Sequence, residues 1–154
     1  MSEVRVRPAG LEEAAALTDL VRRSKAAWGY DAAFMAAVDP VLRVEPGAIA
    51  EGWVWVAEDA KRRVQGVYVL ARTDNPAVMV LDSLFVEPAT LRSGVGAVLF
   101  KHAADAARRY GARVLSIEAD PNAAPFYERM GARRAGAAPG ATPGRILPVY
   151  ELDL

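Results

Sequence analysis

Several features that mark whole classes of protein are missing from this sequence. Its 154 residues include no cysteine and a single histidine. The first absence excludes disulfides, thiolate metal sites and a cysteine nucleophile, and the second argues against a histidine-based metal site. Lysine plus arginine and aspartate plus glutamate number 19 each, so the chain lacks the excess positive charge of a nucleic-acid binder. No apolar run is long enough to span a bilayer.

The remaining composition is that of a globular protein. Hydrophobic residues make up 53% and charged residues 25% of the chain, which is typical of a folded domain with a substantial core. The length suits one domain over residues 1–154. Residues 1–8 are charged and alternating, unlike a signal peptide. We therefore expect a cytoplasmic protein with no metal site and with neither nucleic acid nor membrane as a partner.

Hydrophobic periodicity predicts an alternation of strands and helices. Strands are expected at 3–8, 53–58, 64–72, 77–86, 114–119, 132–138 and 146–154, with a short one near 42–44. Helices are expected at 11–28, 32–38, 94–110 and 123–130. Pro40 is predicted to end the second helix, because the residue before a proline disfavours the helical conformation. Hairpins followed by a β-α-β unit predict an α/β (α+β) fold with a mixed, mostly antiparallel central sheet of about six to seven strands and helices on both faces.

A basic, glycine-bearing loop joins the apolar strand ending at Val86 to the helix beginning at Gly94. The first amides of a helix have no intrahelical partner, and the helix dipole favours negative charge there. Gly94 and Gly96 let the backbone approach a ligand closely, and Arg92 adds a positive charge. The loop suits a pyrophosphate, although a plain glycine-rich turn before a helix is the alternative. It lacks the Gly-Lys-Ser/Thr end of a P-loop, and Leu99 stands where the dinucleotide fingerprint requires its third glycine.

A second pattern lies downstream of this helix. Asp120 is followed by Ala123, by Tyr127 and then by Gly131. In the GNAT N-acetyltransferases an asparagine is followed by alanine three places on, by tyrosine seven places on and then by a glycine. Asp120 stands here in the place of the asparagine.

The glycine loop matches the same family. Its coenzyme A loop reads Gln/Arg-x-x-Gly-x-Gly/Ala, and Gly94 and Gly96 hold the two small positions. Leu91 stands where the family has Gln or Arg, and the basic residue comes one place later, at Arg92. With both motifs in family order, the chain resembles a GNAT N-acetyltransferase over essentially its full length.

The resemblance implies the GNAT fold and acetyl-CoA as the co-substrate. The pantetheine arm is expected to pair with the backbone at Phe85 and Val86, in a cleft at the carboxyl ends of two diverging strands, where α/β sheets bind ligands. The pyrophosphate is expected on the loop amides. The implied cofactor-binding residues are Phe85, Val86, Leu91, Arg92, Ser93, Gly94, Val95, Gly96 and Asn122.

The reaction that the resemblance implies is direct attack of a primary amine, on a small molecule or a peptide, within a ternary complex. Tyr127 takes the family's general-acid position. A phenol with a pKa of about 10 is protonated near neutral pH and can give a proton to a thiolate. Packing of its helix on the sheet is the alternative role for Tyr127. A coenzyme A-sensing module without transferase activity is the alternative function.

The general base is left open between two carboxylates. Asp82 is a charge inside the apolar stretch 78–85, and a buried carboxylate must be paired or functional. It is predicted to be a general base or an ammonium anchor, with an ion pair to a nearby arginine as the alternative. Glu118, on the facing strand, is the second candidate, and a water chain ending at either carboxylate is equally compatible.

Aromatic residues provide the candidate acceptor wall. Trp28, Tyr30 and Phe34 cluster where the first helix breaks, and they either line the acceptor pocket or staple two helices together. Trp53 and Trp55 are further candidates for the same wall, although all five suit a core as well. The alternating terminal strand is predicted to pair across a homodimer.

Overall fold

The computed structural model describes residues 3–154. Its strands are β1 (Arg5–Pro8), β2 (Val54–Glu58), β3 (Val64–Arg72), β4 (Val78–Val86), β5 (Val114–Glu118), β6 (Arg133–Pro139) and β7 (Ile146–Asp153). Its α-helices are α1 (Ala14–Ala26), α2 (Ala32–Leu42), α3 (Pro46–Ala50), α4 (Val95–Arg109) and α5 (Ala124–Arg129). Three 3-10 turns precede α1, α4 and α5: η1 (Leu11–Glu13), η2 (Pro88–Thr90) and η3 (Pro121–Ala123).

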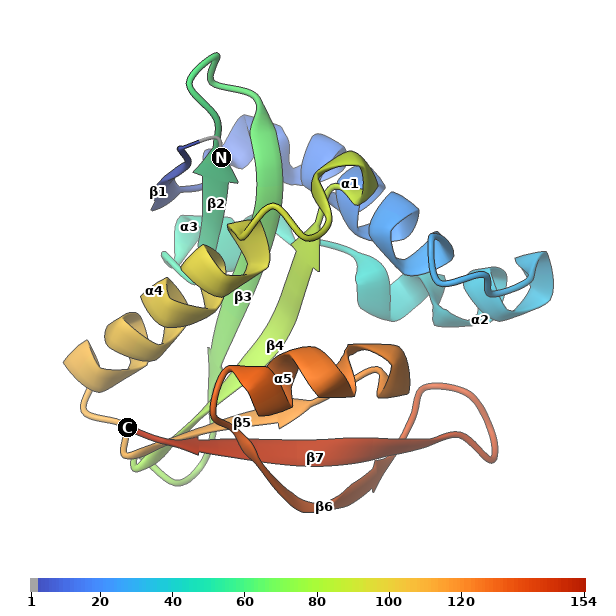
Figure 1. Ribbon diagram of the computed structural model, residues 1–154, viewed down its shortest axis with the longest axis vertical. Helices are drawn as coiled ribbons and strands as arrows, with labels where there is room; N and C mark the ends of the chain where they lie inside the picture. Colours follow the sequence, from blue (N-terminus) through green and yellow to red (C-terminus); the bar gives the residue numbers. More distant parts are fainter. Residues whose placement is uncertain (1–2) are drawn as a thin grey trace.

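The strands form one seven-stranded sheet in the order β1-β2-β3-β4-β5-β7-β6. β4 and β5 run parallel, and the other neighbouring strands run antiparallel. α4 and α5 cover one face of the sheet, and α1, α2 and α3 cover the other (Figure 1). Leu99 and Phe100 are buried on the first face, and Leu17 and Val21 on the second. The mixed, mostly antiparallel sheet with helices on both faces is confirmed.

The parallel pair is short, and this determines where a ligand can enter the sheet. β4 and β5 pair only between residues 78–80 and 114–116. Beyond these residues the two strands diverge (Figure 1), and within residues 3–154 neither strand has a partner on its inner side. The divergence opens the middle of the sheet at the carboxyl ends of β4 and β5, the end at which α/β sheets bind ligands.

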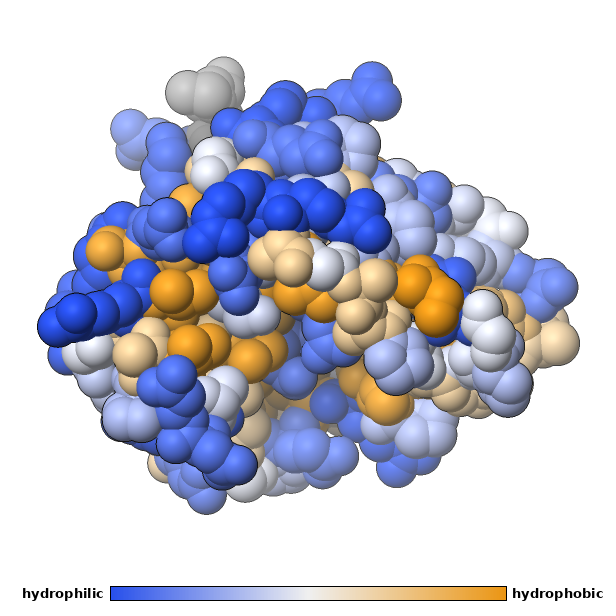
Figure 2. Space-filling model, turned by 90° about the horizontal axis from the view of Figure 1, so that it is seen from below, coloured by the Kyte–Doolittle hydropathy of each residue, from blue (hydrophilic) through white to orange (hydrophobic). Residues whose placement is uncertain are grey.

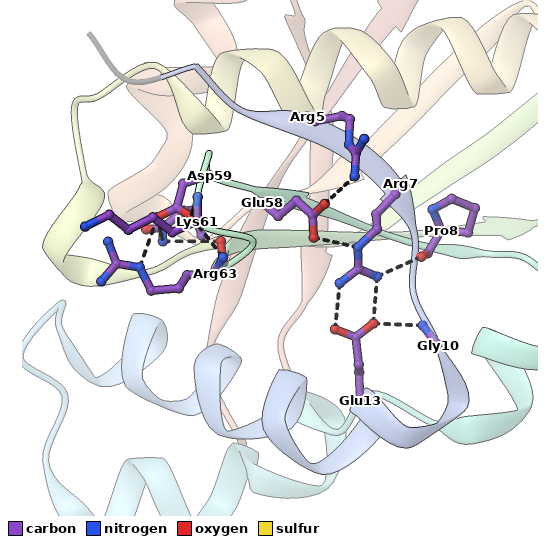
Figure 3. A network of polar contacts seen from close by, with 10 residues as sticks. Arg5, Arg7, Pro8, Gly10, Glu13, Glu58, Asp59, Lys61 and Arg63 are labelled. Carbon is purple, nitrogen blue, oxygen red and sulfur yellow. Dashed lines mark hydrogen bonds and ion pairs between the residues drawn. The ribbon is translucent and has the colours of Figure 1, made fainter.

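The β1 edge of the sheet is held by a network of charged side chains (Figure 3). Arg5 and Arg7 both contact the carboxylate of Glu58, at 2.7 and 2.8 Å. Arg7 also pairs with Glu13 at 2.8 Å, and Glu13 accepts a hydrogen bond from the Gly10 amide. Glu58 is only 4% exposed, and hydrogen bonds from Arg7 and then Arg5 lower the pKa of its carboxyl. The network fastens β1 to β2 and to the turn that starts the first helix.

The prediction that the second helix ends at Pro40 is wrong. α2 continues to Leu42 with Pro40 inside it. Proline has a helix-compatible φ, and near the end of a helix it removes a single hydrogen bond. Val38 and Leu42 are buried on the α1 side of the sheet, and the burial of these side chains favours completing the last turn.

The short strand expected near 42–44 does not form. Leu42 ends α2, and the Val44 amide donates to the hydroxyl oxygen of Thr18 at 3.0 Å. This side-chain acceptor replaces a neighbouring strand. α3 follows with Pro46 at its first position, where proline is favoured, and no periodic pattern in the sequence was long enough to predict it.

The terminal strand does not lie at an edge of the sheet. β7 pairs with β5 on one side and with β6 on the other, so it has no free edge for a second copy of the chain. The edge strand next to β7 is β6, and this end of the molecule carries apolar patches bordered by polar side chains (Figure 2). The predicted route to a homodimer through β7 is therefore wrong, while the oligomeric state itself stays a prediction. None of the described helices has the length and hydrophobicity needed to cross a membrane.

Candidate functional site

A groove of about 1000 Å³ lies where β4 and β5 diverge. Its walls come from β4, β5, the α1–α2 corner, the start of α4, α5 and the β6–β7 loop. The predicted site residues that line it are Trp28, Phe34, Asp82, Phe85, Val86, Leu91, Arg92, Gly94, Gly96, Glu118, Asn122 and Tyr127. Segments from across the chain therefore meet in one cavity. Ser93, Val95 and Tyr30 are not among its lining residues.

The loop before α4 presents a row of free backbone amides to this groove. Gly94 takes a left-handed φ of 93° and caps the helix. Val98 is the first residue of the helix whose amide is bonded, to the carbonyl of Gly94 at 3.1 Å. Within residues 3–154, the four consecutive amides from Gly94 to Ala97 donate to no protein acceptor. Unpaired amides at a helix amino terminus form an anion-binding site.

Glycine is required at the two loop positions for different structural reasons. A Cβ on Gly94 would meet nothing within 4 Å, but the left-handed φ disfavours any other residue there. A Cβ on Gly96 would lie 3.3 Å from the ring of Phe126. Gly94 therefore shapes the loop, whereas Gly96 also allows α4 and α5 to pack closely. Ser93 offers no free donor, because its amide and its hydroxyl both donate to the Thr90 carbonyl. Val95 buries its side chain in the core and contributes a free amide.

Two arginines that have no ion pair among the described residues line the same groove as the row of amides. Arg92 and Arg129 line the groove and take part in no ion pair among the residues that the structure describes. Arg92 also has a positive φ of 68°. Sequence reasoning missed Arg129, whose only signal was its place two residues after Tyr127. Together with the free amides, these cations make the groove suited to phosphate groups.

Tyr127 combines a buried ring with an accessible hydroxyl. The residue is 6% exposed, and its ring packs 5.8 Å from that of Phe100 and 5.1 Å from that of Phe126. In the described part of the chain, the Tyr127 hydroxyl makes no hydrogen bond. Every fully buried side-chain oxygen in that part has a hydrogen-bond partner, so the Tyr127 oxygen is not fully buried. The hydroxyl therefore reaches the groove. Burial raises the pKa of Tyr127, as does the charge of Asp120, so the phenol stays protonated and can donate a hydrogen bond or a proton.

Asp82 lies at a β-bulge on the wall of the groove. Val69 pairs with Ser83 and Leu70 with Leu81, so Asp82 is the extra residue on its strand. Across residues 3–154 its carboxylate has no hydrogen-bond or ion-pair partner, and the ion pair with an arginine that was its alternative role does not occur. Loss of solvent around the side chain raises the pKa of Asp82, which makes it a stronger base than an ordinary aspartate.

Glu118 is the second unpaired carboxylate of the groove. It is the last residue of β5, where its side chain is exposed, and it lines the same cavity as Asp82. β5 is paired with β7 at this point, through Val149, but not with β4. The divergence of the two strands therefore places a free carboxylate on each of the two facing walls.

Asp120 joins three separate segments at one end of the groove. Lys25 of α1 contacts it at 2.6 Å, and Arg145 of the β6–β7 loop at 3.5 Å. The hydroxyl of Tyr30 donates to it at 2.8 Å. Burial alone would raise the pKa of Asp120, but the hydrogen bond from Lys25 and those from Asn122 and Tyr30 outweigh it and lower the pKa. We call these residues, with Phe34, the Asp120 cluster.

Tyr30, Phe34 and Asn122 make contacts within the Asp120 cluster. The rings of Tyr30 and Phe34 stack at 4.1 Å, which supports their role as a staple, although Phe34 lines the groove as well. The Asn122 side-chain amide donates to the Tyr30 hydroxyl and to Asp120, each at 3.1 Å. Sequence reasoning missed the cations of the cluster, Lys25 and Arg145, because they lie far from Asp120 along the chain.

Trp53 and Trp55 do not contribute to the acceptor wall. Trp53 packs against Tyr110 at 5.1 Å, and Trp55 packs against His102 at 4.8 Å. Both contacts involve α4 or the turn after it, and neither tryptophan lines the groove. Within residues 3–154, no group of three or more histidine, aspartate or glutamate side chains is placed to hold a metal ion.

Comparison with known proteins gives one family and several similar folds. A family model described as an acetyltransferase (GNAT) domain matches residues 34–139, more than half of the chain. A search of curated proteins finds no significant match. A solved GCN5-related N-acetyltransferase from Rhodopseudomonas palustris is 20% identical, with a TM-score of 0.79 over 100% of this chain and 98% of that one.

Two further structures were solved with coenzyme A. The PaiA N-acetyltransferase of Thermoplasma acidophilum is 14% identical, with a TM-score of 0.81 over 99% of each chain. The N-acetylglutamate synthase of Neisseria gonorrhoeae, complexed with coenzyme A and N-acetyl-glutamate, is 17% identical. Its TM-score is 0.75 over 100% of this chain and 36% of that one. At these identities the likeness is one of fold.

Proposed function

The chain belongs to the GNAT acetyltransferase family, and on that premise we propose that residues 1–154 form a single N-acetyltransferase domain. It transfers the acetyl group of acetyl-CoA to a primary amine of a small molecule or peptide, by direct attack in a ternary complex. One observation carries the proposal. A single groove holds four free amides at one end and, further along, the accessible hydroxyl of Tyr127 and the unpaired carboxylate of Asp82.

The residues present fit acetyl-CoA. The free amides from Gly94 to Ala97 suit its pyrophosphate, and Arg92, on the same loop, and Arg129 add positive charge to the groove. The inner edge of β4 at Phe85 and Val86 has no strand partner on the β5 side among the described residues, so its backbone is available to the pantetheine arm. The Leu91 amide donates to the Pro88 carbonyl at 3.3 Å, so Leu91 is not one of the free donors, and the amides from Gly94 to Ala97 carry the proposed binding of the pyrophosphate.

Acetyl-CoA supplies an acetyl group activated as a thioester. Asp82 accepts the proton of the acceptor ammonium, which exposes the nitrogen lone pair for attack. Tyr127 donates the proton that the sulfur needs as it leaves. Asp82 suits the role of base because loss of solvent raises its pKa, which makes it a stronger base than an ordinary aspartate. Glu118 is the second candidate.

Calorimetry with a matched pair of variants tests the proposal. We expect acetyl-CoA and desulfo-CoA to bind the wild-type protein and Gly94→Trp to bind neither, because the side chain would fill the space at the amides. Gly52→Trp is the control, since Gly52 has a similar φ of 85° and equally open space but lies outside the groove. It should keep binding. Failure of the wild type to bind, or equal losses in both variants, would refute the site.

Thiol-release assays on an amine panel test transfer itself. The alternative, a coenzyme A-sensing module without transferase activity, is favoured by the two departures from the family pattern, Leu91 and Asp120. Tight binding of acetyl-CoA with no thiol release for any amine would select that alternative. The cytoplasmic location and the homodimer stay predictions from the sequence.

A further inference from the structure

The charged side chains in the acceptor part of the groove fall into a paired set and an unpaired set. We define this part by the α1–α2 corner, the middle of β4, the end of β5 and the β6–β7 loop. Its cations are Lys25 and Arg145, and both lie against Asp120, at 2.6 and 3.5 Å. Their side chains are only 12% and 20% exposed. The two cations are therefore largely shielded from solvent, and both are paired with the carboxylate of Asp120.

Aromatic faces cover these cations further. The Arg145 guanidinium lies 5.0 Å from the ring centre of Tyr30 and 4.7 Å from that of Phe34. Arg145 also donates to the Tyr30 hydroxyl at 2.7 Å, and the Lys25 ammonium lies 5.2 Å from the same ring. Such contacts satisfy a cation without a second anion. Lys25 and Arg145 together carry one positive charge more than Asp120 neutralises. Cation–π contacts with the rings of Tyr30 and Phe34 stabilise this remaining charge.

The unpaired set is negative. Asp82 and Glu118 line the groove with exposed side chains, and neither has an ion-pair partner in the described part of the chain. The walls around them are apolar. They include Trp28, Val38, Val41, Leu42, Leu84 and Leu147. An acceptor that enters this part meets hydrophobic surface and free carboxylates.

We propose that the acceptor is a primary amine on an apolar, aromatic or aliphatic body, with no carboxylate beside the amine, and that α-amino acids are poor acceptors. The inference rests on the proposed function. An ammonium group is attracted by Asp82 and Glu118, and the apolar body packs against the walls. A carboxylate on the same molecule would face these two like charges, while Lys25 and Arg145, the two cations beside Asp120, are already paired with that residue, and this costs binding energy.

Three acceptors that share one side chain test this inference. Phenylethylamine, phenylalaninamide and phenylalanine are compared by kcat/KM for thiol release at saturating acetyl-CoA. Phenylalaninamide and phenylalanine match closely in size and shape, and each kcat/KM is corrected for the fraction of the amine that is unprotonated at the assay pH, so the ratio of the corrected values reports the effect of the carboxylate charge. We expect phenylalaninamide to be preferred by roughly tenfold or more, because like-charge juxtaposition disfavours the acid. Phenylethylamine should resemble the amide.

The outcomes separate this inference from the proposed function. Equal or better turnover of phenylalanine overturns the inference and leaves the acetyltransferase in place. Coenzyme A binding with turnover of neither phenylethylamine nor phenylalaninamide also overturns it. Absence of coenzyme A binding, or of transfer to every amine in the wider panel, refutes the proposed function and the inference with it.

Two variants test whether charge pairing is the cause. Asp120→Asn should lower the preference for the amide severalfold, because Lys25 and Arg145 then lose the carboxylate that neutralises them. Glu118→Gln should lower it as well, by removing one repulsive charge. For each variant, kcat/KM for phenylalaninamide is divided by kcat/KM for phenylalanine on the same protein. Changes in stability or coenzyme A affinity affect both values alike and cancel in this ratio. An unchanged ratio in both overturns the explanation.

Asp105→Asn is the matched control. It makes the same charge change on an exposed side chain that pairs with Arg108 on α4 and lies outside the groove. The ratio should stay at the wild-type value. If this variant lowered the ratio as much as Asp120→Asn does, net charge and not the Asp120 cluster would set the preference, and the inference would fail.

Discussion

Glu58 and Asp82 are both carboxylates on strands of the same sheet, and their surroundings give them opposite properties. Glu58 at the β1 edge is enclosed by Arg5 and Arg7 (Figure 3), and their hydrogen bonds lower its pKa. Asp82 at the opening between β4 and β5 has no partner within residues 3–154, and loss of solvent raises its pKa. The partners of a carboxylate therefore decide whether it holds the fold together or is free to accept a proton.

The two regions should respond differently to mutation. Changes at Asp82, Glu118 or Tyr127 should reduce activity and leave stability nearly unchanged, because these two carboxylates and the Tyr127 hydroxyl make no contacts among the described residues that hold elements together. Changes at the β1 edge should reduce stability and spare activity. Each of the following variants tests one side of this contrast.

The largest effect is expected from Asp82→Asn. Loss of the base should lower kcat/KM by roughly 10²- to 10⁴-fold at neutral pH. The melting temperature should stay the same or rise, because a raised carboxyl pKa means that the charged form is disfavoured in the folded protein. Steady-state thiol release and thermal unfolding measure the two effects. Wild-type turnover by this variant would assign the base elsewhere, with Glu118→Gln as the next variant to assay.

Tyr127→Phe should have the next largest effect. The hydroxyl is lost and the ring packing is kept, so kcat should fall by roughly 10²- to 10³-fold while coenzyme A affinity and melting temperature stay near wild type. Tyr68→Phe is the matched control. Tyr68 is also buried, but it lies outside the groove and its hydroxyl is hydrogen-bonded to Nδ1 of His102 at 2.7 Å. The Tyr68→Phe variant should keep wild-type activity and have a lower melting temperature. Unchanged turnover by Tyr127→Phe would remove this residue from the mechanism.

Glu58→Gln should lower the melting temperature by several degrees without changing kcat/KM. A carboxyl whose pKa is lowered by folding contributes stability above its unfolded pKa, near 4.5. That contribution is lost as the pH falls through the lower folded value. The difference in melting temperature between wild type and variant should therefore be full at neutral pH and shrink below about pH 4.5. A difference that is constant over this range would contradict the pairing.

Leu91→Arg should have the smallest effect. Leu91 is exposed on the loop that carries the free amides, and an added cation there should tighten coenzyme A binding by a few-fold, since exposed ion pairs contribute little. Calorimetry at low and high salt measures the gain, which salt should reduce. Leu11→Arg, an exposed leucine outside the groove, is the control and should bind as the wild type does.

Much of the fold followed from local patterns. Alternation and apolar runs predicted the seven strands, and the helical stripe after Gly94 predicted α4. Pro40 misled, because burial of Val38 and Leu42 outweighs the local preference of a proline. The place of the terminal strand was also misjudged, because the pairing of β7 with both β5 and β6 depends on contacts between distant segments that its own sequence does not report.

By itself, the sequence determined the glycine loop, the free amides that such a loop produces and the residue types at the groove, since these depend on neighbours along the chain. Only the tertiary structure decided which charges are paired. Lys25 and Asp120 are separated by 95 residues yet lie 2.6 Å apart, while Asp82, with arginines elsewhere in the chain, contacts none of them among residues 3–154. Electrostatic pairing depends on distance in space and on exclusion of water, and both are set when the sheet closes and its helices pack.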